Sequence, residues 1–182
     1  MVTETISRAK RAHRLMRPAE CLSRVQTLAR ERLPAGLREF QWSSGNAMGK
    51  IWYGNKDLHY EIWSRERLGT IEIGLHFEAD PLTNARLLAA FAANAKKVRR
   101  TLSDARIEEW DRGWARVWEP LPHRRPDESL ATELAKRIAA YVSALEPILR
   151  RELPSNVAWA EPKPRPARAK AAETSRASRS AR

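Results

Sequence analysis

Residues 57–78 contain the feature that most restricts the fold, an alternation of apolar and polar residues in two runs. Successive side chains of a β-strand point to opposite faces of a sheet, so a period of two predicts strands here. The runs predict an antiparallel hairpin that turns around residues 65–68, with Ser64 opposite Gly69. One face is uniformly apolar and is expected to form the core; it carries Leu58, Tyr60, Ile62, Ile71, Ile73, Leu75 and Phe77.

The opposite face of this hairpin is polar and carries Asp57, His59, Glu61, Trp63, Thr70, Glu72, Gly74, His76 and Glu78. In the predicted register Asp57 lies beside His76. Glu61 lies beside Glu72, and such a carboxylate pair raises the pKa of one partner. Imidazole and carboxylate groups together suit Zn, Mn or Fe. One hypothesis is therefore a metal-dependent hydrolase or nuclease with Zn or Mn, whose candidate catalytic residues are His59, Glu61, Glu72, His76 and Glu78.

The same polar face has a plainer interpretation. Antiparallel sheets commonly bury one face and expose the other to water, and polar residues on the exposed face need no function. Two details point the other way: facing carboxylates are unfavourable, and Gly74, expected opposite His59, would leave room for a ligand or a crossing chain. The pattern as a whole favours a solvated face, with the metal site as the alternative.

The rest of the chain predicts helices over residues 18–33, 81–102 and 127–149, where apolar residues recur every three to four positions. Asp80 and Asp127 are expected to cap the second and third helix, and Pro147 is expected to kink the third or to start a short extra turn. Strands are predicted at 39–43 and 50–54, and a second hairpin at 105–119 turns at residues 111–113.

These elements predict an α+β fold with about six antiparallel strands in the order α-β-β-β-β-α-β-β-α and helices on one face. The order resembles that of several small binding proteins, including type III secretion chaperones; the resemblance is one of topology, which does not by itself imply a function.

The second hairpin is rich in tryptophan and arginine. Trp110 and Trp114 are expected to lie close together across its turn, with Arg106, Glu108, Arg116 and Trp118 on one face. Aromatic rings interleaved with arginine can stack on bases or hold a peptide, so Trp114 and Arg116 are candidate nucleic-acid contacts. In the alternative interpretation the rings cover the sheet and Arg116 pairs with Glu108.

The net charge of +12 is concentrated at the two ends of the chain. Residues 1–17 hold five basic residues against one acidic, and residues 161–182 hold seven against two. We expect a basic arm over 1–17, a single α+β domain over 18–160 and a disordered basic tail over 161–182. The positive charge of both ends predicts contact with nucleic acid or another polyanion. The candidate residues are Arg8, Lys10, Arg11, Arg14, Lys163, Arg165, Arg168 and Lys170.

Other features narrow the function class. The sequence holds no apolar run long enough to span a membrane, and Cys21, its single cysteine, excludes a disulfide framework and a cysteine-rich zinc site. We therefore expect a cytoplasmic protein without a membrane partner. Together these observations favour a non-enzymatic binding or adaptor protein without a cofactor, whose sheet face binds a protein partner or a second copy of the chain.

Overall fold

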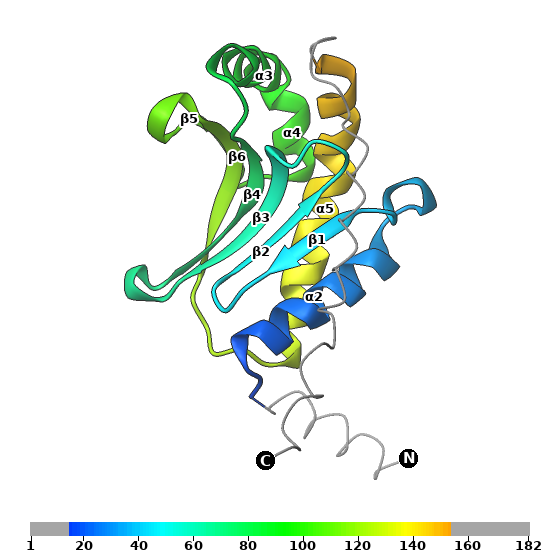
Figure 1. Ribbon diagram of the computed structural model, residues 1–182, viewed down its shortest axis with the longest axis vertical. Helices are drawn as coiled ribbons and strands as arrows, with labels where there is room; N and C mark the ends of the chain where they lie inside the picture. The colour runs from blue at the N-terminus through cyan, green and yellow to red at the C-terminus, as the bar shows by residue number, and fades with distance from the viewer. Residues whose placement is uncertain (1–14, 154–182) are drawn as a thin grey trace, which may run out of the picture.

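The computed structural model describes residues 15–153, which form helices and a sheet in the predicted order (Figure 1). Its strands are β1 (Gln41–Ser44), β2 (Met48–Trp52), β3 (Leu58–Arg65), β4 (Thr70–Phe77), β5 (Arg106–Glu109) and β6 (Ala115–Pro122). Its helices are α2 (Pro18–Arg32), α3 (Pro81–Ala93), α4 (Ala95–Thr101) and α5 (Glu128–Glu152). Apart from residues 15–17, the predicted basic arm and the tail over 161–182 lie outside the described residues.

The strands form one antiparallel sheet in the order β1-β2-β3-β4-β6-β5, and the helices pack on it, which confirms the α+β class. Figure 1 shows α5 running along the sheet with α2 beside it, while α3 and α4 lie near one end. The chain leaves β4 through α3 and α4, enters the edge strand β5, and returns as β6 beside β4. No helix among the described residues has the length and apolar character needed to cross a membrane.

The predicted helix caps are confirmed. The Asp80 side chain accepts hydrogen bonds from the backbone N–H groups of Leu82 and Thr83, and Asp127 accepts one from Leu130. The second predicted helix is divided at Asn94, whose side-chain amide donates to the Ala90 carbonyl over 2.8 Å. Asparagine side chains compete in this way for backbone groups, which explains why α3 ends there. The last helix continues through Pro147 to Glu152.

The two faces of the β3–β4 hairpin are as predicted, but its register is not. Ser64 pairs with Ile71 and not with Gly69, because a short 3-10 turn and Gly69, at φ 65°, close the hairpin. This shift by two residues keeps every side chain on its predicted face and changes its partner. His59 consequently pairs with His76.

The sheet is buried on both faces, which corrects the expectation of a solvated polar face. On the helix side Tyr60 and Ile73 are at most 1% exposed. On the other side His59 and His76 are also only 1% exposed. Tryptophan side chains contribute to this burial, since the Trp110 ring meets the edge of the His76 ring at a centroid distance of 5.4 Å. We call this second surface, with His59, Glu61, Glu72 and His76, the polar face.

Candidate metal centre

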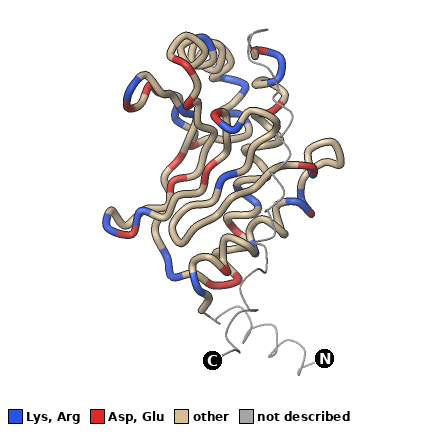
Figure 2. The backbone as a smooth tube through the Cα atoms, in the orientation of Figure 1, with Lys and Arg blue, Asp and Glu red and all other residues tan. Residues whose placement is uncertain are grey.

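Four of the five predicted catalytic residues meet on the polar face. His59 and Glu61 come from β3, His76 comes from β4, and Glu78 follows β4 directly. Each offers one donor atom, and these atoms lie within 4.8 Å of one another. The alternation of the strands and the pairing of His59 with His76 bring them together. Figure 2 shows acidic positions in red along the middle of the sheet. We call these four residues the metal cluster.

His59 is oriented as a metal-binding histidine would be. Its Nδ1 lies 3.0 Å from the backbone carbonyl of Lys56, so Nδ1 carries the proton and donates it there. The lone pair of Nε2 then points into the cluster, 3.4 Å from Glu61 Oε2. Metal-ligating histidines commonly donate their other ring N–H to a carbonyl or carboxylate in this way.

Lys50, on β2, supplies the positive charge of the cluster. Its Nζ lies 2.9 Å from His59 Nε2, 3.1 Å from Glu61 Oε2 and 3.7 Å from Glu78 Oε2. Lys50 was not among the predicted site residues, although it precedes the apolar Ile51 in the strand and its place on the polar face follows from that alternation. Its side chain is 25% exposed, whereas that of Glu61 is 3% exposed.

The ionisation of Glu61 and His76 suits a metal ligand. Burial by itself raises the pKa of Glu61, but the interactions with His59, His76 and Lys50 outweigh it and lower the pKa to about 2. Burial lowers the pKa of His76 to about 3, so the imidazole is neutral at pH 7. Metal binding requires a charged carboxylate and a neutral imidazole.

His76 also has an unsatisfied nitrogen. Its Nδ1 is buried and has no hydrogen-bond partner among the described residues. Glu78 Oε1 lies 3.9 Å from it, too far for a hydrogen bond. A buried nitrogen without a partner costs roughly 1–3 kcal/mol, and a metal ion would satisfy it.

The four donor groups fit zinc or manganese if they move closer together. Four ligands at about 2.1 Å in a tetrahedron are separated by roughly 3.4 Å. The present separations reach 4.8 Å, so the side chains would have to close around an ion. The Lys50 ammonium group would have to leave, because it contacts the same lone pairs.

The fifth predicted catalytic residue, Glu72, belongs to a different network. It pairs with Trp63 in the sheet, so the prediction that it neighbours Glu61 is wrong. Its carboxylate accepts a hydrogen bond of 2.6 Å from Arg65 and another from Arg116. Arg116 in turn binds Glu108, as expected across the strands. Glu72 therefore bridges the two arginines, and Glu108 supplies the second negative charge of this network.

The tryptophan hairpin has the predicted facing. The Trp110 and Trp114 rings lie 5.8 Å apart, and Trp114 is half-buried. Arg116 is 6% exposed, and its guanidinium lies 3.9 Å from the centroid of the Trp118 ring. A nucleobase platform that uses Trp114 and Arg116 stays a prediction, and Arg116 would have to give up these contacts to serve it. The predicted nucleic-acid contacts Arg8, Lys10, Arg11, Arg14, Lys163, Arg165, Arg168 and Lys170 lie outside the described residues.

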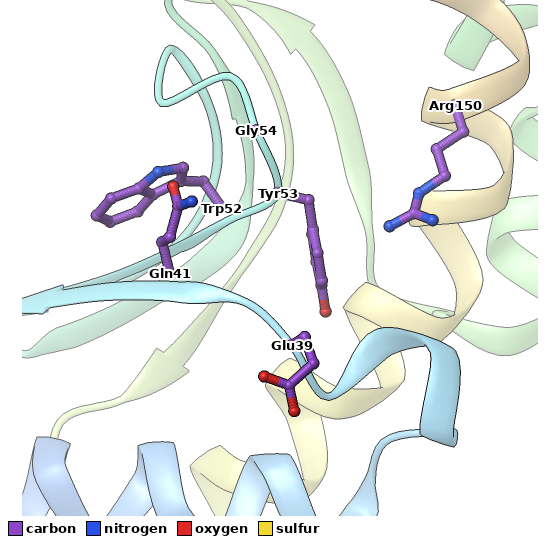
Figure 3. A pocket seen from close by; sticks show the side chains of 6 residues that line it. All are labelled: Glu39, Gln41, Trp52, Tyr53, Gly54 and Arg150. Atoms are coloured by element: carbon purple, nitrogen blue, oxygen red, sulfur yellow. The ribbon is translucent and has the colours of Figure 1, made fainter. Parts of the chain in front are cut away.

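A pocket that the sequence analysis did not anticipate lies between the sheet and α5 (Figure 3). Its volume is about 420 Å³, and it is lined by Glu39, Gln41, Trp52, Tyr53, Gly54 and Arg150. Figure 3 shows Arg150 reaching from α5 toward Tyr53, with its guanidinium 5.2 Å from the centre of that ring. The Tyr53 hydroxyl donates to the Leu37 carbonyl, and Arg150 binds Glu146. The contact of Arg150 with the Tyr53 ring therefore links α5 to the residue that follows β2.

The chain matches no protein-family model, and it has no significant match among curated proteins or solved structures.

Proposed function

We propose that this protein binds one divalent transition-metal ion, preferentially zinc, through the metal cluster. The observation that carries the proposal is the buried Nδ1 of His76, which has no partner among the described residues, in a cluster whose four residues each place one donor atom within 4.8 Å of the others. Two imidazoles and two carboxylates are a ligand set that zinc accepts in four-coordinate sites.

The position of the Lys50 side chain gives the metal cluster two alternative states. With its ammonium group inside, the cluster is a buried ion-pair network; with the side chain turned to solvent, the same lone pairs are available to a metal. Both cations cannot occupy the site, since two unit charges 4 Å apart repel by about 4 kcal/mol at an effective dielectric constant of 20, and the double charge of the metal ion doubles this repulsion. Lys50 therefore lowers the metal affinity and competes with the ion.

The burial of the cluster favours metal binding over hydrolysis of a polymer. His59 and His76 are each 1% exposed, so a phosphodiester would not reach an ion held between them unless the tryptophan cover moved. The hypothesis of a hydrolase or nuclease at this site consequently has less support than metal binding itself. A nuclease assay with Zn or Mn on the wild type and on His76→Ala tests it, and equal activity would exclude this cluster.

Cobalt titration tests the metal site directly, because tetrahedral Co²⁺ absorbs visible light and reports its ligands. We expect saturable binding to the wild type, displaced by Zn²⁺. Lys50→Met should tighten binding at least about tenfold because the competing charge is removed. His76→Ala should weaken it roughly 10- to 100-fold or more. His123→Ala, at a half-buried histidine outside the cluster, serves as the matched control.

The thermal unfolding midpoint gives an independent measure, since a ligand that binds the native state raises it. Zinc should raise the midpoint of Lys50→Met by more than that of the wild type and should leave His76→Ala nearly unchanged. If Lys50→Met bound neither Co²⁺ nor Zn²⁺ in a saturable way, the cluster would be a buried ion-pair network and the proposal would fail.

A second proposal concerns the ends of the chain, where most of the net charge lies. We propose that these segments contact nucleic acid or another polyanion, as in an adaptor protein whose α+β body binds a protein partner or a second copy. The supporting observation is the charge distribution: residues 161–182 carry seven basic residues and two acidic ones. Such a segment releases counterions from phosphates and gives affinity without sequence preference.

A further inference from the structure

A larger cavity lies at the other side of the sheet from the metal cluster. Its volume is about 620 Å³, within the range of small-molecule sites. It is bounded by the first turns of α2 and α5, the turn between β3 and β4, and the loop that precedes α5. Its floor consists of buried apolar side chains, among them Leu22, Ile62, Ile71, Leu130 and Leu134.

The rim of this cavity is strongly basic. Arg65, Arg67, Arg124 and Arg125 line it, and Glu66 is the one carboxylate among its lining residues. Arg65 is held by Glu72, and Arg124 is held by Glu133. Within residues 15–153, Arg67 and Arg125 have neither an ion pair nor a hydrogen bond from their side chains. An apolar floor below two unpaired guanidinium groups matches a ligand with an apolar tail and an anionic head.

We infer that this cavity binds a small amphipathic carboxylate, with its alkyl chain on the Ile62–Ile71 floor and its head at Arg67 and Arg125. Burial of the alkyl chain against the apolar floor removes its surface from water, so the apolar chain provides most of the affinity. The arginines select an anion over a neutral or cationic head, because guanidinium groups bind carboxylates through paired hydrogen bonds.

The charge of the rim argues against occupation by the chain's own ends. Residues 1–14 hold four basic residues against one acidic, and residues 154–182 hold seven against two. Either segment would bring further positive charge to a rim that already has an excess of arginine. A separate anionic molecule fits the site better than these segments do.

Isothermal titration calorimetry with decanoate tests the inference, with decanol and decyltrimethylammonium as neutral and cationic probes of the same chain length. We expect saturable binding of decanoate by the full-length protein, weaker binding of decanol and none of the cation. Arg67→Ala and Arg125→Ala should each weaken decanoate binding by roughly two- to fivefold, since exposed ion pairs contribute modestly. Arg99→Ala, at an exposed position on α4, is the matched control.

Variants that fill the cavity test whether decanoate binds there or elsewhere on the protein. Ser64→Phe and, independently, Ala47→Phe place a ring at lining residues and remove no charge. At least one of these variants that retains the wild-type circular dichroism should lose decanoate binding by more than about tenfold, whereas the Arg99→Ala control should bind it normally. Three results would each overturn the inference. The protein could bind decanoate and decyltrimethylammonium equally well, or show no saturable binding of decanoate. Alternatively, Ser64→Phe and Ala47→Phe could both fold and bind decanoate as tightly as the wild type.

Discussion

Gly74 has no side chain, and this allows the neighbouring strand β6 to pack closely against it. A Cβ atom at this position would lie 2.5 Å from the backbone oxygen of Val117 and 2.6 Å from the Cβ of Trp118. Gly74 was expected to leave room for a ligand opposite His59. It pairs instead with Glu61 on β3, and on its other side the space is taken by Trp118. The glycine therefore allows a tryptophan to pack over the strand.

We predict that Gly74→Ala destabilises the protein by about 1–3 kcal/mol, the usual effect of forcing extra atoms into a packed core. Urea unfolding followed by circular dichroism measures this change. Gly45→Ala is the control, since its Cβ would meet nothing within 4 Å. A Gly74→Ala midpoint equal to that of the control would show that β6 yields to the added methyl group.

Glu146 is a buried carboxylate whose titration affects stability. Its side chain accepts hydrogen bonds of 2.9 Å from Tyr60 and from Arg150. Burial raises its pKa above the ordinary 4.5, and the hydrogen bonds from Arg150 and Tyr60 offset only part of that effect. The native state therefore holds this proton more tightly than the unfolded chain does.

From this direction we predict that the contribution of Glu146 to stability is greatest below pH 4.5 and declines as the pH rises through its native pKa. Glu146→Gln removes the titration, so the free energy of unfolding of the wild type should fall relative to the variant as the pH increases. Urea unfolding between pH 4 and 8 measures the difference, with the exposed Glu31→Gln as control. Parallel profiles for wild type and Glu146→Gln would contradict the prediction.

At the scale of the element, α5 is unusual because it contains a proline and still runs without interruption from Glu128 to Glu152. Pro147 lacks the N–H that would bond the Ser143 carbonyl, and its ring crowds that carbonyl. Buried residues on both sides, such as Leu145 and Ile148, hold the helix against the sheet. Tertiary packing thus compensates for the lost hydrogen bond.

We predict that Pro147→Ala stabilises the protein by about 1–3 kcal/mol, because it restores the hydrogen bond and relieves the crowding in a helix that is already formed. The midpoint of urea unfolding should rise, while Lys136→Ala, at an exposed position on the same helix, should change it little. A lower midpoint for Pro147→Ala would mean that the proline ring itself contributes packing to α5.

The elements show which parts of the structure could be predicted from sequence. Alternation identifies the two faces of β3 and β4, and Asp80 and Asp127 mark helix starts, because these signals are local. The hairpin register could not be derived, since turns of different even length preserve the same faces. Burial of the polar face was missed because its cover includes Trp110, which is distant in sequence and reaches His76 only after β5 and β6 join the sheet.

At the scale of the whole molecule, the three proposed sites are separate. The metal cluster lies on one face of the sheet, the arginine-rimmed cavity lies on the other, and most of the net charge belongs to the ends of the chain. Ligands of opposite charge are therefore directed to different places: a cation to His59 and Glu61, an anion to Arg67 and Arg125. Each proposal can fail without affecting the others.

The basic C-terminal segment gives a prediction that depends on ionic strength. For duplex DNA the logarithm of the binding constant falls with the logarithm of salt concentration, with a slope of about −0.9 for each phosphate contact. Removal of residues 161–182, which carry seven basic residues, should therefore flatten the slope by up to about 6. Fluorescence anisotropy with a labelled duplex, at several salt concentrations, measures the two slopes.

A charge variant separates the loss of cations from the loss of chain length. Substitution of Lys163, Arg165, Arg168 and Lys170 by glutamine should flatten the slope by up to about 3.6. The same substitution at Arg99 and Arg100, exposed on α4, is the matched control for charge within the folded body. If the truncated protein kept the wild-type slope, the phosphate contacts would have to come from elsewhere in the chain, and the tail would no longer explain affinity for nucleic acid.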